Sequence, residues 1–286
     1  MKVAIIIRPE HRFMPMQDAL CEVARQKGYD VFGYKDPSLV GKLVDYDYVI
    51  YHPNTPPKDI KCKGKVGWWM CDLRHPNDLQ PGNPDVIFLC NTHYIGAYQE
   101  KFECPVYYMP QCGLDVRGRD SGRRFDTDFV FIGDIMFHKY HANRIPIISG
   151  LKKEGVDVTM ITGERFTEDQ VSIYRHAPFC LSISPHYGGY TSNRLYNILA
   201  SGGFCFSLYF PGIDRLFENN KHLVWFKTVG ELCGLMDYYY ENPEEYCMIK
   251  EAGWRLFEEK HTASARVKNM LDIMKGRLNN FQGYLA

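Results

Sequence analysis

The stretch Tyr190–Phe206, YTSNRLYNILASGGFCF, decides the fold class, because it contains a loop end, a short helix, a glycine stop and a buried strand. Thr191, Ser192 and Asn193 are good N-cap residues directly ahead of the helix. Arg194 follows them in the first turn. Backbone N–H groups, polar caps and an arginine suit an anion such as a diphosphate, although an ordinary capped helix of an α/β domain shows the same pattern.

Composition indicates a folded protein without a global electrostatic field. The 286-residue chain is 45% hydrophobic, and its 34 basic and 34 acidic residues give a formal net charge of zero. This balance provides no general attraction to nucleic acid or to an anionic membrane. The ten cysteines form no Cys-x-x-Cys pair, and the N-terminal MKVAIIIRPE is too short for a signal peptide or a membrane span. We therefore expect a cytoplasmic protein with reduced thiols, mostly in its core.

Apolar runs alternate with helical patterns along the whole chain, which predicts mainly parallel sheets. In the first half, strands are expected at 3–7, 30–34, 48–51, 66–70, 86–90 and 106–109, and helices at 18–27 and 92–102. The stretch 113–128 is rich in glycine and charge and is the best candidate linker. In the second half, strands are expected at 129–132, 156–161, 179–183, 204–209 and 223–226, and helices at 141–153, 167–175, 229–240, 243–260 and 262–277. The pattern predicts two successive doubly wound α/β units.

Small and polar residues follow successive strands of the second half. Gly133 and Asp134 follow its first strand, and Gly163 and Glu164 follow its second. Ligands of open α/β sheets bind beyond the carboxyl ends of the strands, so these residues and the helix start at Thr191 predict a nucleotide pocket. Glu164 is a candidate for binding ribose hydroxyls, although turns favour such residues in any case.

The second half resembles the C-terminal domain of GT-B glycosyltransferases, especially the spore-maturation (CgeB-like) type. The matching pieces are FIGD at 131–134, ITGE at 161–164, TSNRLYNILASGG at 191–203, PGIDRLF at 211–217 and EKHTASAR at 259–266. The first half resembles the family more loosely, through VGWWMCD at 66–72 and VYYMPQCGLD at 106–115.

This resemblance implies an α/β fold in which two Rossmann-like domains face a cleft and the C-terminal helices cross back. The domains would be residues 1–125, on the acceptor side, and 126–286, which would hold a nucleotide-diphosphate sugar as donor. The family generally needs no bound metal or other cofactor. Arg194 would clamp the diphosphate, with Tyr190 and the cap residues beside it, because helix dipoles and basic side chains meet its charge.

Two positions depart from a pattern of the larger clan, whose retaining members carry two glutamates with seven residues between them. The corresponding residues here are Gly189 and Asn197. Asn197 can hydrogen-bond a ribose or sugar hydroxyl, but it carries no charge. The departure leaves the stereochemical outcome open and motivates one alternative, a non-catalytic nucleotide-sugar-binding module.

Transfer to a hydroxyl acceptor needs an activating group, and the strand ends of the first half offer His52, Asp72 and His93. Asp72 is the preferred general base, because Trp68 and Trp69, a few residues upstream, would tend to desolvate its surroundings. Each of the three can also be an ordinary turn or cap residue. Arg8, directly after the first strand, is a candidate to reach the phosphates.

The leading hypothesis is a metal-independent glycosyltransferase whose acceptor is a glycan, a small molecule or a DNA base. Basic clusters motivate a phage-type DNA glycosyltransferase acting on a hydroxylated base, although solvated loops explain them better. These clusters are Lys61, Lys63 and Lys65, and Arg117, Arg119, Arg123 and Arg124. A dinucleotide oxidoreductase has a compatible fold, but no G-x-G-x-x-G follows either first strand.

Overall fold

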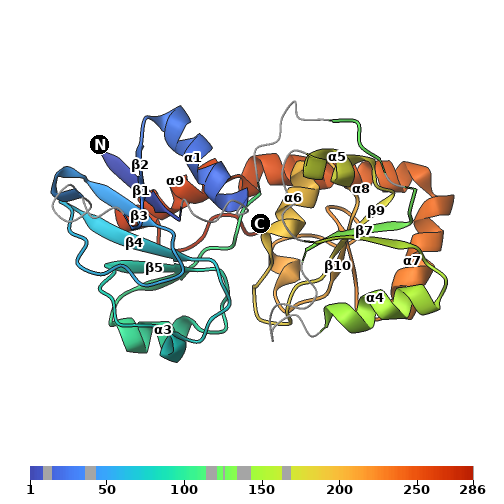
Figure 1. The fold of residues 1–286 in the computed structure, drawn as a ribbon, viewed down its shortest axis with the longest axis horizontal. Helices are drawn as coiled ribbons and strands as arrows, with labels where there is room; N and C mark the ends of the chain where they lie inside the picture. Colours follow the sequence, from blue (N-terminus) through green and yellow to red (C-terminus); the bar gives the residue numbers. More distant parts are fainter. Residues whose placement is uncertain are drawn as a thin grey trace. The chain divides into compact units, whose positions relative to one another are not determined.

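A computed structural model describes residues 1–8, 15–35, 43–113, 121–124, 126–133, 143–162 and 169–285. They form two compact units, each built on a parallel sheet (Figure 1). The first unit contains Met1–Gln111, Tyr187–Tyr190 and Ala263–Gln282, and the second contains Cys112–His186, Thr191–Thr262 and Gly283–Ala286. The predicted α/β class with two Rossmann-like units is confirmed.

The first sheet has six strands in the order β2-β1-β3-β4-β5-β6. Its strands are β1 (Val3–Ile7), β2 (Asp30–Gly33), β3 (Tyr48–Tyr51), β4 (Lys65–Met70), β5 (Val86–Leu89) and β6 (Val106–Tyr108). The apolar runs that predicted β1 and β5 are buried throughout, as expected of strands covered on both faces. Helices α1 (Pro15–Lys27) and α9 (Ala263–Met274) cover one face and α3 (Ile95–Phe102) the other (Figure 1), with short 3-10 turns η1 (Leu43–Asp45) and η2 (Pro76–Asp78).

The second sheet has five strands in the order β11-β10-β9-β7-β8. These are β7 (Phe129–Ile132), β8 (Val158–Ile161), β9 (Phe179–Ser182), β10 (Cys205–Leu208) and β11 (Val224–Phe226). Helix α4 (Arg144–Lys153) lies on one face and α5 (Asp169–His176) on the other (Figure 1). The remaining elements are α6 (Asn193–Ala200), η4 (Ile213–Arg215), α7 (Val229–Glu241), α8 (Pro243–Leu256) and the π-helical turn η5 (Phe257–His261). Aromatic packing fills this core, and Phe204 stacks on Tyr246 with ring centres 4.7 Å apart.

The last helix, α9, follows the second sheet in the sequence but packs on α1 and β4 of the first unit. Arg266 on α9 is fully buried, and its Nε lies 3.1 Å from the carbonyl oxygen of Pro110 and 3.2 Å from that of Gln111. The chain therefore crosses back at its C-terminal end, as the resemblance implied. The compact units group α9 with the first sheet, and the domain division into 1–125 and 126–286 stays a prediction.

All ten cysteines are free thiols. Five of them are buried, but Cys247 is exposed, so the expectation of core thiols holds only in part. Across the described residues, every helix is too short or too polar to traverse a lipid bilayer.

Candidate functional site

The second sheet reverses its strand order between β7 and β9. β8 lies beyond β7 on one side, and β10 and β11 lie beyond β9 on the other. Helix α4 follows β7 and α6 follows β9, so both helices begin at the carboxyl edge of the sheet. Doubly wound sheets bind ligands at such a switch point. The helix start predicted at Thr191–Arg194, which begins α6, therefore lies at the edge of the sheet where a ligand is expected.

Arg194, in the first turn of α6, joins the ends of the two strands at the switch point. Its side chain is buried, with 7% of the residue exposed. Its Nε donates to the Ile132 carbonyl at 2.5 Å, and its Nη1 donates to the Ile183 carbonyl at 3.4 Å. The centre of the guanidinium lies 4.3 Å from the Phe131 ring centre. Arg194 thus holds a positive charge beside the carboxyl ends of β7 and β9.

The position of Arg194 explains why residue 133 is a glycine. Its φ is +150°, and a Cβ placed on it would lie 2.1 Å from Nη2 of Arg194. A side chain at position 133 would therefore displace the guanidinium. The other predicted residues of these strand ends, Asp134, Gly163 and Glu164, lie outside the described residues.

A second arginine, Arg144, reaches the same place, and sequence reasoning missed it. Arg144 is the first residue of α4 and is 4% exposed. Its Nε donates to the Ile183 carbonyl at 3.3 Å, and its guanidinium lies 5.6 Å from the Phe131 ring centre. A cation in the first turn of a helix is opposed by the helix dipole. That conflict was a usable sequence signal, because Arg144 and Arg194 share it.

The start of α6 differs from the prediction in its capping. Ser192 occupies the N-cap position, but its side chain makes no capping hydrogen bond. The Ser192 hydroxyl instead lies 3.5 Å from Arg194 Nη1, and the Ser192 amide donates to Ser184 Oγ at 3.2 Å. The Thr191 hydroxyl donates to the Ser192 carbonyl at 3.4 Å. Side-chain capping by these hydroxyls, inferred from the sequence, is therefore wrong, because they serve the arginine and the local backbone.

Asn193 and Asn197 were predicted to act beside Arg194, and they differ in how exposed they are. Asn193 is the first residue of α6 and is partly exposed at the sheet edge. Asn197 lies one turn further along the helix and is 3% exposed. Asn197 is thus buried in the second unit to a similar degree as Arg194, and its role in donor binding stays a prediction.

At the carboxyl edge of the first sheet, four predicted residues follow adjacent strands. Arg8, His52, Asp72 and His93 come after β1, β3, β4 and β5, which are neighbours in the sheet. The topology therefore brings all four to one edge. The guanidinium of Arg8 lies 5.1 Å from the ring centre of Tyr34.

Asp72 is the carboxylate of this group, and it is partly exposed. Its Oδ2 accepts a hydrogen bond from Asn54 Nδ2 and lies 3.5 Å from Arg74 Nη2, and 40% of its side chain is exposed. Trp68 and Trp69 are fully buried and donate their indole N–H groups to main-chain carbonyls. These partners of Asp72 are polar, and the carboxylate is oriented by an amide and a guanidinium.

His52 is buried rather than presented to solvent. It is 4% exposed, and its Nδ1 lies 3.3 Å from the Trp69 carbonyl oxygen and 3.8 Å from Cys71 Sγ. Burial lowers the pKa of His52 to about 4, because the charged imidazolium loses its hydration. His52 is therefore a neutral core residue at neutral pH, which does not suit it to contact a substrate directly.

His93 is exposed and belongs to a group of aromatic side chains. Its ring centre lies 4.7 Å from that of Tyr94 and 5.3 Å from that of Tyr187, both in edge-to-face arrangements. Tyr187 and Tyr190 come from the segment between β9 and α6, which belongs to the first unit, whereas Thr191 belongs to the second. Tyr190, predicted beside Thr191 in one site, is thus assigned to the other unit.

The lysine cluster lies at the opposite end of the first sheet. Lys65 is the first residue of β4, so Lys61 and Lys63 precede the strand at its amino end. Lys63 also pairs with Asp45, at 3.7 Å. These lysines therefore add no positive charge to the edge that carries Asp72. Of the arginine cluster, Arg123 and Arg124 are exposed, and Arg117 and Arg119 lie outside the described residues.

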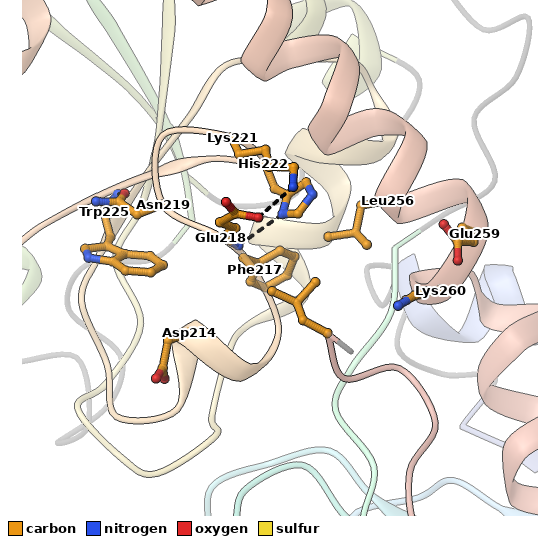
Figure 2. A pocket seen from close by; sticks show the side chains of 11 residues that line it. Asp214, Phe217, Glu218, Asn219, Lys221, His222, Trp225, Leu256, Glu259 and Lys260 are labelled. Atoms are coloured by element: carbon orange, nitrogen blue, oxygen red, sulfur yellow. Dashed lines mark hydrogen bonds and ion pairs between the residues drawn. The ribbon is translucent and has the colours of Figure 1, made fainter.

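A cavity of about 580 Å³ lies in the second unit, between the β10–β11 connection and the end of α8 (Figure 2). Phe217 and Leu256 lie near its middle, with Trp225 and Lys260 on opposite sides (Figure 2). None of the predicted site residues lines it. Within the part of the chain that the structure describes, no three His, Cys, Asp or Glu side chains are grouped to hold a metal ion.

The fold and its switch point define a GT-B glycosyltransferase architecture. A family model described as glycosyl transferase-like matches residues 124–272, more than half of the chain, and the protein belongs to this family. The spore-maturation subtype remains a prediction. A comparison with curated proteins found no match.

Solved structures support the same fold over nearly the whole chain. An alpha-glucosyltransferase, solved with UDP and a 13-mer DNA containing an HMU base, superposes with a TM-score of 0.63 at 12% identity and covers 96% of this chain and 99% of that one. HepE of Anabaena, solved with UDP and glucose, has a TM-score of 0.57 at 9% identity, with 96% and 100% covered. AviGT4, a glycosyltransferase involved in avilamycin A biosynthesis, has a TM-score of 0.58 at 13% identity, with 96% and 98% covered.

Proposed function

We propose that this glycosyltransferase binds the diphosphate of a nucleotide-sugar donor at the switch point of the second sheet. The observation that carries the proposal is the meeting of two buried arginines, Arg144 and Arg194, with the amino ends of α4 and α6. Helix N-termini and guanidinium groups both stabilise phosphate oxygens. The positive charge is supplied by the chain itself, so we propose that the diphosphate is bound without a metal ion.

The reaction that this site would support is displacement at the anomeric carbon of the donor sugar. The acceptor oxygen forms a bond to that carbon while the bond from the carbon to the diphosphate oxygen breaks, and the electron pair leaves with the diphosphate. Positive charge at the switch point stabilises this leaving group. In an inverting course Asp72 takes the acceptor proton, with Asn54 and Arg74 orienting the carboxylate. In a retaining course the departing phosphate oxygen takes it.

UDP is the first donor nucleotide to test. Two structures with the same fold were solved with UDP, and one of these also contains glucose. The DNA-base acceptor stays a weaker candidate, because the lysines that motivated it lie at the amino end of β4. A polyanion needs cations along its path, and this edge of the first sheet lacks that lysine cluster.

The test is a thermal-shift series with UDP, GDP, CDP, ADP and TDP. A ligand at about a hundred times its dissociation constant stabilises the folded state by about 2.7 kcal/mol, and we expect one nucleotide to do so selectively. Arg144→Lys and Arg194→Lys should weaken this stabilisation. Arg255→Lys is the matched control, because Arg255 is exposed on α8 and pairs with Glu251. Equal melting temperatures with and without every nucleotide would contradict the proposal.

A further inference from the structure

Four aromatic side chains gather at the carboxyl edge of β4 and β5 in the first unit, and we call them the ring cluster. They are His75, His93, Tyr94 and Tyr187. Tyr94 is central, with ring centres 5.3 Å from His75, 4.7 Å from His93 and 6.1 Å from Tyr187. His93 is exposed and the other three are partly exposed, so the ring cluster is open to solvent rather than part of the core.

The Tyr187–Tyr190 segment is held by hydrogen bonds to other parts of the first unit. The Thr92 amide donates to the Gly188 carbonyl at 2.8 Å, and the Tyr108 hydroxyl donates to the Gly189 carbonyl at 2.6 Å. A Cβ on Gly188 would lie 2.7 Å from Thr92 Oγ1, and Gly189 has a φ of +67°. These two glycines allow the close approach. The Tyr187 ring is therefore held in place by backbone hydrogen bonds and is not merely a loop side chain.

Polar groups surround the ring cluster without giving it a net charge. His75 lies three residues after Asp72, and its Nδ1 accepts from the Asn77 amide at 3.2 Å. Arg74 offsets the charge of Asp72. Asn91 at the end of β5 is fully buried, and its Nδ2 makes no hydrogen bond within the described residues. These rings meet mostly edge to face, and partly exposed aromatic rings with polar edges and balanced charge suit an uncharged, hydroxylated ring.

We propose that the ring cluster is the acceptor subsite, and that it binds a pyranose ring of an uncharged glycan or glycoside. The inference rests on the proposed function and specifies its acceptor. One face of a pyranose presents C–H groups, which pack on aromatic faces, while its hydroxyls point outward to polar partners. A ring held there lies beside the strand end that carries Asp72. Tyr187 is then an acceptor-binding residue supplied by the segment that leads into α6.

The alternative occupant is a nucleobase, which also stacks on aromatic side chains. A base within DNA brings phosphates, and the cations that would meet them are not provided by the lysines at the amino end of β4. The charge balance around Asp72 therefore favours the sugar ring. The two occupants can be separated by titrating each one.

The binding test uses methyl β-D-glucopyranoside, methyl β-D-galactopyranoside, methyl α-D-mannopyranoside and thymidine as probes. Ring-proton NMR signals of His75 and His93 are followed during each titration, with UDP present. We expect at least one pyranoside to shift both signals and thymidine to shift neither. Shifts with thymidine alone, or with no probe at millimolar concentration, would overturn the inference.

Variants of Tyr187 test whether acceptor binding at the ring cluster contributes to sugar transfer. Tyr187→Ala should raise the acceptor KM about tenfold, as expected for the loss of one stacking ring, and Tyr187→Phe should restore it. Tyr238→Ala is the matched control, because Tyr238 is an exposed tyrosine on α7 of the second unit. An unchanged acceptor KM in Tyr187→Ala would reject the subsite. UDP-induced stabilisation of the wild-type protein is measured in parallel, and its absence would reject the proposed function instead.

Discussion

The carboxyl edges of the two sheets are built on different principles. In the second unit, buried arginines donate to the main-chain carbonyls that end β7 and β9, and Gly133 leaves the space that Arg194 fills. In the first unit, the corresponding edge carries partly exposed side chains, including Asp72 and His93. At the edge of the second sheet, main-chain carbonyls hold the arginine side chains in place. At the edge of the first sheet, the surface is determined by which side chains follow the strands.

This difference indicates which kind of substrate each unit is suited to bind. A positive charge held in place by main-chain carbonyls suits the part of the ligand that all nucleotide-sugar donors share, the diphosphate. A surface of side chains can change with the acceptor while the sheet beneath it stays the same. The comparison predicts that changes in the first unit alter turnover and acceptor affinity, and that changes at the switch point alter stability and donor affinity.

The largest effect is expected from Asp72→Asn. Loss of a general base reduces turnover by about 10²- to 10⁴-fold, while donor affinity should stay the same, because the donor is held by the other unit. Steady-state kinetics and nucleotide titration measure the two quantities. Asp78→Asn, at an exposed acid of η2, is the control. Turnover near the wild-type value would remove Asp72 from the reaction.

Gly133→Ala should damage the second unit through its fold. The new Cβ would lie 2.1 Å from Arg194 Nη2 at a φ of +150°, and strain plus overpacking should lower the free energy of unfolding by about 4 kcal/mol. Urea denaturation measures this change. Gly234→Ala is the control, because a Cβ there meets nothing within 4 Å, and helix propensity should make it slightly stabilising. Equal stabilities of the two variants would refute the close fit of Arg194 and Gly133.

Acid should destabilise the protein through His52. The folded-state pKa of His52 is lowered to about 4 from its ordinary value of 6.5, so between these pH values the unfolded chain binds a proton that the folded chain does not. The free energy of unfolding therefore falls by about 3 kcal/mol as the pH drops through this window. His52→Gln should flatten that part of the pH profile of urea midpoints. Parallel profiles for wild type and variant would show that His52 titrates normally.

Arg194→Lys should give the smallest of these effects, a loss of about tenfold in nucleotide affinity. Lysine keeps the charge, but it cannot reproduce the planar fork that joins Ile132 and Ile183. Isothermal titration with the stabilising nucleotide measures the change. If affinity is unchanged, the charge alone suffices and the geometry of the guanidinium is irrelevant to donor binding.

Much of the fold was predictable because its strands are short, continuous apolar runs. β1, β3 and β7 have the predicted bounds, and α6 begins within two residues of the predicted start. Strand ends then placed Gly133, Asp72 and His93 at sheet edges. Capping by Ser192 was wrong because the guanidinium of Arg194, two residues further along, lies beside the hydroxyl.

Other features depend on tertiary contacts that leave no local signal. The hydrogen bond from Arg144 to the Ile183 carbonyl is one such contact, although the position of Arg144 in a first helical turn was itself a signal. The hydrogen bonds of the Tyr187–Tyr190 segment to Thr92 and Tyr108 are the others. The accessible surface of His52 was also unpredictable, since the same strand-end position can be buried or exposed.

The most direct test of the central claim is a crystal structure of the protein soaked with the nucleoside diphosphate that stabilises it. We expect diphosphate density at the amino end of α6, within hydrogen-bond distance of its first-turn amides and near Arg144 and Arg194. Density in the cavity beside Trp225 and Lys260 instead, with the switch point empty, would contradict it.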